Sequence, residues 1–529
     1  MLPTVTALRD TVDDLKAAAR LVRDLPGWLR AQIPQAQAQA EVRDALQTRA
    51  ARFLWLVEHG VYAQPHSPYR VLLQHAGCEP GDMQALVRRE GLEGALRHLF
   101  ELGVYVTDDE LKGRAPIVRG SLQLMTSFTQ FLNPLVKPHL LLLTGGSSGG
   151  AARVPISLGM IRMLAVAKSI HHAAHGTSYD AIASWAMNPM PLHLAAAKIG
   201  TPIQLWLLPL SPLPREVRVM ARLGDWMTQR HGLRMPPPTP CEIAAPETMA
   251  RAIGTARARY GQVLVNCATS AAVRASNAAR ERGIRLDGVT FDVRSEPLTG
   301  ARRRDVEASG ASVSNSYGSA EFTFVAAGCP DRTAADDSHV YAHTFAVVGA
   351  PREPGATDDR AQMLLVTTLD PTAPVIGLNA QMGDLATVKV RPADCCLLGR
   401  LGLTTHVANI RSYDKLTGEG VTVARSDMLR VLEEQLPRQF GGTSVDYQLA
   451  EEAGADGLVR LILRISPRIG PLDEEAARAV LLSGLDKGGL VDRHMAVLWR
   501  QAGTVVIRRD EPVATAAGKV LPFHRGHRT

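Results

Sequence analysis

The chain has 529 residues, of which 46% are hydrophobic and 21% are charged. This composition is typical of a folded globular protein, and it excludes a disordered chain, a collagen-like chain and a mini-protein. The length is too great for one hydrophobic core and predicts two to four domains. The net charge of +7 is small for this length, and an aromatic content of 5% argues against a base-stacking surface for nucleic acid.

Residues 1–21 combine charged and apolar residues in a pattern that predicts an amphipathic helix rather than a signal peptide. No stretch reaches the roughly 20 apolar residues that a membrane span needs. The six cysteines are scattered without a Cys-x-x-Cys pair, so their spacing indicates neither a disulfide framework nor a zinc ribbon. We therefore expect a cytoplasmic protein with reduced thiols.

Apolar residues at helical spacing predict a helical segment over residues 1–115. Near its end, residues 103–110 predict a short strand followed by a helix that Thr107 or Asp108 caps, with Glu110 in the first turn. From 116 to 400, short apolar runs alternate with helical stretches, which predicts an α/β core. The predicted strands lie at Leu140–Leu143, Ile203–Leu208, Val263–Val265, Val289–Val293, around Val313 and at Met363–Thr367.

Two proline-rich stretches, 208–214 and 236–240, predict loops within this core. Residues 401–529 predict a smaller α+β unit with helices at 426–436 and 473–485 and strands at 458–465 and 504–508. The expected fold class is α/β, with a large N-terminal part of several subdomains, mixed sheets and helices, and a small α+β lid domain at the C-terminal end.

The most distinctive local feature is a glycine-rich loop at 144–150 that follows the predicted strand Leu140–Leu143. Its glycines let backbone N–H groups converge, and Thr144, Ser147 and Ser148 add hydroxyl donors, so the loop favours phosphate binding. A Walker A loop is excluded because Gly150 is followed by two alanines rather than by Lys and Ser or Thr. The spacing Gly-x-Ser-x-Gly keeps open a nucleophile elbow with Ser147 as nucleophile.

Further loops follow the predicted strands in a fixed order: Ser295-Glu296-Pro297, Asn315-Ser316-Tyr317-Gly318-Ser319-Ala320-Glu321, Gly383-Asp384, Gly399-Arg400 and Gly518-Lys519. In this order, with the glycine-rich loop, they resemble the adenylate-forming superfamily of acyl-CoA synthetases, adenylation domains and luciferases. Within that superfamily the chain resembles phenylacetate-CoA ligases and the acyl-protein synthetases of bacterial luminescence. The resemblance covers roughly residues 100–529.

The resemblance implies a role for each matched residue. Tyr317 would stack on adenine, Ser319 would offer a hydroxyl to the α-phosphate, Glu321 would bind Mg²⁺, and Lys519 would bridge the carboxylate and the α-phosphate. Asp384 and Arg400 would contact the ribose, and His193 would lie at the acyl pocket. The implied nucleotide-binding set is Thr144, Gly145, Gly146, Ser147, Ser148, Gly149, Gly150, Ser295, Glu296, Pro297, Asn315, Ser316, Tyr317, Gly318, Asp384 and Arg400.

The sequence departs from the family pattern in three respects. The phosphate loop lacks the usual Lys after its last Gly, and Arg153 is the nearest basic residue that follows it. Ala320 stands where the family has Thr, and the stretch after Arg400 lacks the Asp that usually marks the hinge. The resemblance implies ATP- and Mg²⁺-dependent activation of a small carboxylic acid, with coenzyme A as the expected acceptor thiol. The open alternatives are transfer to an amine, a carrier-protein thiol or a protein cysteine, a serine hydrolase that uses Ser147, and a nucleotide-binding protein without turnover.

Two other patterns are interpreted as structural. His171 and His175 share one helical face, which could hold zinc, but no Glu follows the first His as in a zincin, so a helix surface or a pocket wall is favoured. The run Arg302-Arg303-Arg304 lacks interleaved aromatic residues and is interpreted as a solvated helix end rather than a nucleic-acid patch.

Overall fold

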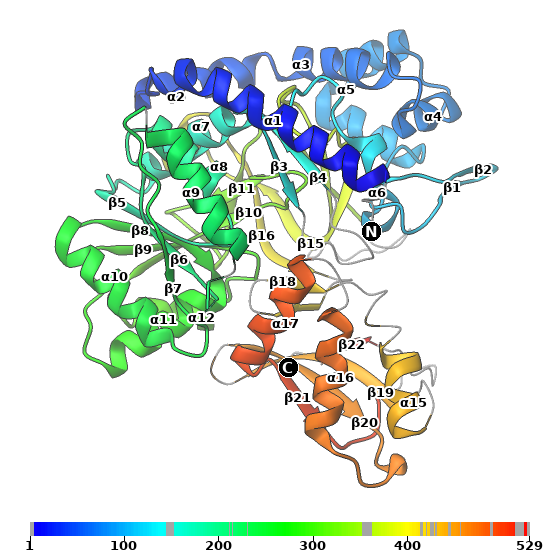
Figure 1. Cartoon of the computed structure of the whole chain (residues 1–529). Coiled ribbons are helices and arrows are strands. Elements are labelled where there is room, and N and C mark those ends of the chain that lie inside the picture. The colour runs from blue at the N-terminus through cyan, green and yellow to red at the C-terminus, as the bar shows by residue number, and fades with distance from the viewer. Residues whose placement is uncertain are drawn as a thin grey trace.

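The structure, a computed structural model, describes residues 5–143, 153–210, 212–213, 215–229, 231–351, 362–412, 416–418, 421–423, 428, 431–442, 446–454, 456, 458–486, 490–513 and 523–525. Within these ranges the chain forms a large part and a smaller C-terminal unit, which lies below it in Figure 1. None of the described helices is both long enough and apolar enough to cross a membrane.

Helices form most of the chain up to Leu111 and lie along the top of the large part in Figure 1. They are α1 (Val5–Leu29), α2 (Gln35–Gln47), α3 (Arg49–Val57), α4 (Pro68–His75), α5 (Pro80–Glu101) and α6 (Asp108–Leu111). Leu96 of α5 and Phe345 of the large sheet are fully buried members of the same hydrophobic cluster. The N-terminal helices therefore share a core with the sheet.

The start of α6 is fixed by a reciprocal capping box. Thr107 Oγ1 accepts a hydrogen bond from the Glu110 N–H at 3.2 Å, and the Glu110 carboxylate accepts one from the Thr107 N–H at 2.8 Å. Both exchanges satisfy backbone donors that the helix itself leaves unpaired. The predicted cap is confirmed at Thr107, whereas the predicted strand before it is reduced to a single bridge between Val106 and Ala380.

The large sheet has the strand order β13-β14-β15-β16-β12-β11-β10-β9-β8-β5-β6-β7. One half is parallel and alternates with helices, as the α/β pattern predicts. Its strands are β5 (Ala181–Trp185), β6 (Ile203–Leu208), β7 (Pro238–Pro240), β8 (Val263–Ala268), β9 (Val289–Arg294) and β10 (Ser312–Tyr317). Its helices are α7 (Leu158–Ala174), α8 (Met190–Lys198), α9 (Arg215–Gln229), α10 (Pro246–Tyr260), α11 (Thr269–Glu281) and α12 (Gly300–Glu307).

The predicted loop at 236–240 is wrong in part, because Pro238–Pro240 forms β7 and pairs with β6. Proline has no N–H to donate, so it fits a strand only where one side needs no ladder partner. Strand β7 lies at the edge of the sheet, where that condition holds. Strand β8, in contrast, is buried along its whole length, as expected for a parallel strand covered on both faces.

The other half of the large sheet is antiparallel. Its elements are β11 (Ala326–Gly328), β12 (Ser338–Val340), β13 (Phe345–Ala350), β14 (Gln362–Thr368), β15 (Ala380–Val390), α13 (Leu397–Arg400) and β16 (Thr405–Ser412). Strand β16 pairs with both β12 and β15. These ladder hydrogen bonds make residues 405–412 part of the large sheet, so the predicted boundary at residue 400 has to move past Ser412.

Among the described residues, three two-stranded hairpins lie outside the large sheet: β1 (Ile117–Arg119) with β2 (Leu122–Leu124), β3 (Leu140–Leu143) with β4 (Arg153–Ile156), and β17 (Leu416–Gly418) with β18 (Val421–Val423). The C-terminal unit contains α15 (Leu436–Phe440), β19 (Tyr447–Ala453), β20 (Val459–Ile465), α16 (Glu474–Asp486), α17 (Leu490–Ala502), β21 (Val505–Arg508) and β22 (Phe523–Arg525). Its sheet order is β21-β20-β19-β22, and Tyr447 and Trp499 fill its core.

Candidate functional site

Two of the predicted site loops emerge at the same edge of the sheet. Ser295 follows β9, and Tyr317 is the last residue of β10, which runs parallel to β9. Because the carboxyl ends of parallel strands meet at one edge, the loops that follow them lie side by side. On its other side β10 pairs with β11 in the antiparallel direction, so the sheet changes character at this point. Ligands bind at such edges in open α/β sheets.

Tyr317 and Asp384 are brought into direct contact. The Tyr317 hydroxyl donates a hydrogen bond of 2.8 Å to Asp384 Oδ2. Burial, together with the adjacent carboxylate, raises the pKa of Tyr317 well above its ordinary range, so the phenol stays protonated and keeps donating. Asp384 lies on β15, beside Ser412 of β16, whereas Tyr317 ends β10. The pair therefore joins the two halves of the large sheet.

The turn after Tyr317 is tightly built. A Cβ on Gly318 would lie 1.6 Å from the Thr323 carbonyl oxygen, so only glycine fits there. Thr323 itself has φ 56°, a conformation that costs a non-glycine residue about 1–3 kcal/mol and that is found mainly at functional sites. Ser319 Oγ accepts a hydrogen bond of 3.2 Å from the Phe322 N–H. The turn is thus held in one conformation that sets the position of Glu321.

Glu321 is buried at 7% exposure beside a cation that the sequence did not suggest. Lys112 Nζ lies 3.7 Å from Glu321 Oε1 and 2.8 Å from Asp108 Oδ1. The ammonium group occupies a position where a positive charge is favourable, since two carboxylates face it. Carboxylates are the side chains that usually bind Mg²⁺ in proteins, together with phosphate oxygens and water. No local pattern connects Lys112 with Glu321, which explains why sequence reasoning missed it.

Ser295, Glu296 and Pro297 form the loop after β9. Ser295 has φ 70°, again a strained position for a non-glycine residue. The Glu296 carboxylate accepts hydrogen bonds from Ser270 Oγ at 2.8 Å and from Arg302 Nη1 at 3.0 Å. Its side chain is 1% exposed and that of Arg302 is 3% exposed. The Glu296 carboxylate therefore anchors the loop to α11 and α12.

The same contacts correct the interpretation of the arginine run. Arg302 and Arg303 are buried, and Arg303 donates to the carbonyl oxygens of Val313 and Ala335, each at 2.7 Å. The carbonyl and carboxylate oxygens that accept hydrogen bonds from these guanidinium groups offset the cost of burying them. The predicted solvated helix end is wrong for these two residues, and Arg304 alone is exposed.

Asn315 and Ser316 point into the protein rather than toward the edge of the sheet. Asn315 Nδ2 donates to Ser338 Oγ at 2.8 Å, and Ser316 Oγ donates to Asp292 Oδ1 at 2.8 Å. Asp292 also pairs with the buried ammonium group of Lys168. Asn315 and Ser316 therefore hold the end of β10 in place through hydrogen bonds inside the protein, and Tyr317 follows them directly.

The predicted histidines and Arg400 lie in helices or at a helix end, and not in the loops that follow β9 and β10. His193 is fully buried in α8, and burial lowers its pKa to about 4. His171 Nε2 contacts Ser314 Oγ at 3.1 Å and His175 Nε2 contacts the Gly328 carbonyl oxygen at 3.1 Å, so this helical face packs against the sheet and is not an exposed helix surface. Arg400 is the exposed last residue of α13.

The glycine-rich loop, with Thr144, Gly145, Gly146, Ser147, Ser148, Gly149 and Gly150, and the C-terminal Lys519 lie outside the described residues. The flanks of the loop are described: β3 and β4 form an antiparallel hairpin in which Leu143 pairs with Arg153. A nucleophile elbow needs a strand of the parallel sheet that runs directly into a helix. The hairpin context therefore does not favour the serine hydrolase.

The chain matches no protein-family model and no curated protein sequence. Its structure is similar to that of a 2-hydroxyisobutyryl-CoA ligase in complex with 2-HIB-AMP and CoA, at 15% identity, over 90% of this chain and 89% of that chain, with a TM-score of 0.58. A malonyl-CoA ligase is 13% identical over 80% and 88%, with a TM-score of 0.42. An amide bond synthetase from Marinactinospora thermotolerans is 15% identical over 91% and 97%, with a TM-score of 0.43. The first of these similarities shows that the chain has the fold of the adenylate-forming enzymes.

Proposed function

We propose that this chain, which has the fold of the adenylate-forming enzymes, activates a small carboxylic acid with ATP and Mg²⁺ to an acyl-adenylate and passes the acyl group to the thiol of coenzyme A. The observation that carries the proposal is the contact between Tyr317 and Asp384 at 2.8 Å, beside the turn that holds Glu321. These residues belong to separate sequence motifs that the resemblance assigned to one nucleotide. Their meeting supports a shared nucleotide site.

In this proposal the Tyr317 ring lies against adenine, and Asp384 accepts hydrogen bonds from the ribose hydroxyls. The glycine-rich loop, residues 144–150, donates its backbone N–H groups to the phosphates. Ser319 offers its hydroxyl to the α-phosphate. Of the loop after β9, Ser295 and Pro297 border the nucleotide, and the buried Glu296 carboxylate keeps them in place.

Adenylation requires two anions to meet. A carboxylate oxygen attacks the α-phosphorus, the bond from that phosphorus to the oxygen bridging it to the β-phosphate breaks, and pyrophosphate leaves. Electrostatic stabilisation of this meeting is the main catalytic task. Lys519 supplies one positive charge between the acid and the α-phosphate. Mg²⁺, when bound, neutralises charge on the phosphates, and Glu321 is the residue that would hold it.

The Glu321 environment fits such an ion. The Lys112 ammonium group already lies 3.7 Å from Oε1, which makes it a stand-in for a cation at the carboxylate. Lys112 Nζ also lies 2.8 Å from Asp108 Oδ1. Lys112 would therefore keep its ion pair with Asp108 when a metal ion binds Glu321. Lys112 and Asp108 thus hold a positive charge beside the Glu321 carboxylate.

The acceptor is proposed to be coenzyme A because the 2-hydroxyisobutyryl-CoA ligase with the similar fold was solved with CoA bound. The acyl-adenylate carries AMP as leaving group, so a thiolate can attack the acyl carbon directly. Transfer to a carrier-protein thiol, a protein cysteine or an amine would use the same first half-reaction. The acceptor therefore has to be tested separately from adenylation.

The test is ATP–pyrophosphate exchange with a panel of aryl and small aliphatic acids. We expect exchange with at least one acid, and Lys519→Ala should lower its rate by about 10²–10³. Silence with every acid, with ATP still bound, would favour nucleotide binding without turnover. Labelling of Ser147 by a fluorophosphonate would favour the hydrolase. With an active acid, mass spectrometry of the CoA thioester then decides the acceptor.

A further inference from the structure

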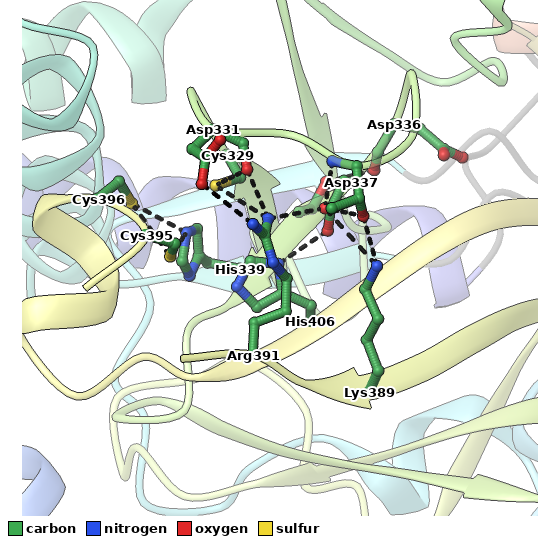
Figure 2. A network of polar contacts seen from close by, with 12 residues as sticks. Cys329, Asp331, Asp336, Asp337, His339, Lys389, Arg391, Cys395, Cys396 and His406 are labelled. Carbon is green, nitrogen blue, oxygen red and sulfur yellow. Dashed lines mark hydrogen bonds and ion pairs between the residues drawn. The ribbon is translucent and has the colours of Figure 1, made fainter. Parts of the chain in front are cut away.

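Three cysteines and one histidine from separate parts of the chain meet at one point. Cys329 follows β11, and His339 lies in the middle of β12, which pairs with β11 in the antiparallel direction. Cys395 and Cys396 arrive from the connection between β15 and β16 and directly precede α13. The three sulfur atoms and one imidazole nitrogen all lie within 4.8 Å of one another. Figure 2 shows this cluster at one end of a polar network.

The separations match the edges of a coordination tetrahedron. His339 Nε2 lies 3.1 Å from Cys396 Sγ and 3.9 Å from Cys395 Sγ, and the two adjacent sulfur atoms are 4.0 Å apart. Zinc bonds of about 2.3 Å to sulfur and about 2.1 Å to nitrogen place tetrahedral ligands about 3.6–3.8 Å apart. Small rotations of the side chains would bring all four atoms to these distances.

His339 is held in the orientation that a metal ligand needs. Its Nδ1 lies 2.6 Å from the Leu403 carbonyl oxygen, which can only accept, so Nδ1 carries the proton and donates a hydrogen bond to that oxygen. The lone pair then resides on Nε2, the nitrogen that faces the sulfur atoms. A backbone carbonyl that fixes the second ring nitrogen is the usual partner of a metal-bound histidine. The ring is fully buried, so water does not compete for Nε2.

The surroundings also suit thiolates. Arg391 Nη1 lies 3.7 Å from Cys329 Sγ and 3.0 Å from Asp337 Oδ2, which places a guanidinium charge beside the cluster (Figure 2). Three thiolates with one divalent ion leave one excess negative charge, which this guanidinium partly balances. A Cβ on Gly399 would lie 2.9 Å from Cys395 Sγ and 2.5 Å from the Ala393 carbonyl oxygen. Glycine there leaves room for the sulfur.

We propose that Cys329, His339, Cys395 and Cys396 bind one zinc ion. Three sulfur ligands and one nitrogen ligand in a closed, buried tetrahedron are typical of structural zinc. All four positions are taken by the protein, so the ion has no open position for a substrate. The ion would connect the β11–β12 hairpin to the start of α13. In the sequence, β13, β14 and β15 lie between these two segments. The inference does not depend on the proposed function.

The first test is metal analysis of the full-length protein, purified with a reductant and without chelator or affinity metal. We expect about one zinc per chain, which is the stoichiometry of a single four-ligand site. Replacement by Co²⁺ should produce tetrahedral d–d absorption together with thiolate-to-cobalt charge transfer. A wild-type protein that contains no zinc and takes up no Co²⁺ after reduction overturns the proposal. A disulfide between Cys329 and Cys396, found by mass spectrometry, also overturns it.

The zinc content of single variants shows which thiols bind the ion. Cys396→Ser and His339→Ala should lose most of the bound zinc, and Cys395→Ser, at the partly exposed ligand, is the variant least disturbing to folding. Cys267→Ser is the matched control, because Cys267 is 1% exposed in β8 and lies outside the cluster. It should retain full zinc content. Equal zinc content in Cys395→Ser, Cys396→Ser and wild type would refute the assignment, whatever the stability of the variants.

Discussion

The Tyr317 hydroxyl donates a 2.8 Å hydrogen bond to the carboxylate of Asp384 on β15, a strand that β16, β12 and β11 separate from β10 in the sheet. The contact links the last parallel strand, β10, to the strand that carries the proposed ribose ligand. A hydrogen bond to a charged group contributes about 1.5–3 kcal/mol. The pair is therefore sensitive to changes at either residue, but in different ways.

Asp384→Asn should raise the KM for ATP by about 10–100-fold, because it weakens charge-assisted hydrogen bonds to the ribose, each worth about 1.5–3 kcal/mol. Tyr317→Phe keeps the ring that is proposed to lie against adenine and should change the KM for ATP much less. ATP–pyrophosphate exchange measures both. The exposed Asp44→Asn on α2 is the control and should behave as wild type. An unchanged KM in Asp384→Asn would contradict the ribose role.

Glu321→Gln should raise the Mg²⁺ concentration that gives half-maximal activity and lower the exchange rate by about 10²–10³, since one charged contact to the phosphates is lost. The measurement is a Mg²⁺ titration of the exchange rate at saturating ATP. Glu281→Gln, at an exposed carboxylate near the end of α11, is the isosteric control. If Glu321→Gln needs no more Mg²⁺ than the control, Glu321 is only the partner of Lys112.

Glu296→Gln should lower the free energy of unfolding by about 3–5 kcal/mol, because it leaves the buried Arg302 guanidinium without its charged partner. Both side chains of this pair are almost fully buried. Glu307→Gln, which removes the partly exposed partner of Arg303 and Arg332, should cost about 1 kcal/mol or less. Urea unfolding measures both variants. Equal losses would show that the Glu296 pair is not the anchor of its loop.

The stability of the protein should fall as the pH falls below about 6.5, in part because of His193. Burial lowers its pKa to about 4, and both ring nitrogens lack a hydrogen-bond partner among the described residues. Below pH 6.5 the unfolded chain protonates this histidine while the folded protein keeps it neutral, so protons favour unfolding until the pH reaches about 4. Each pH unit within this window costs about 1.4 kcal/mol.

His193→Leu removes this titration without breaking a described hydrogen bond. Its stability should therefore decline less steeply between pH 6.5 and pH 4 than that of the wild type, by about 1.4 kcal/mol per pH unit. Urea unfolding at pH 7, 6 and 5 provides the comparison. Parallel curves for the two proteins would mean that His193 is charged in the folded state.

Local patterns in the sequence were sufficient to predict several individual strands and a helix cap. The strands at Leu140–Leu143 and Ile203–Leu208 have the predicted bounds, and Thr107 was one of the two residues predicted to cap the helix that carries Glu110 in its first turn. Such features depend on residues close together in the chain, whose periodicity or side-chain chemistry acts over a few residues. The order of the loop motifs likewise led to the fold that the comparison with solved structures supports.

The sequence by itself thus determined several of the helices and strands and the fold class, together with the motifs that lie in the loops. Only the tertiary structure decided which distant residues meet: Lys112 with Glu321, Arg302 with Glu296, and three cysteines with His339. The cysteine spacing carried no metal signature, because the ligands come from a hairpin and from a connection between later strands. The strand order of the sheet brings them together, and that order is set by long-range pairing and burial that no local pattern contains.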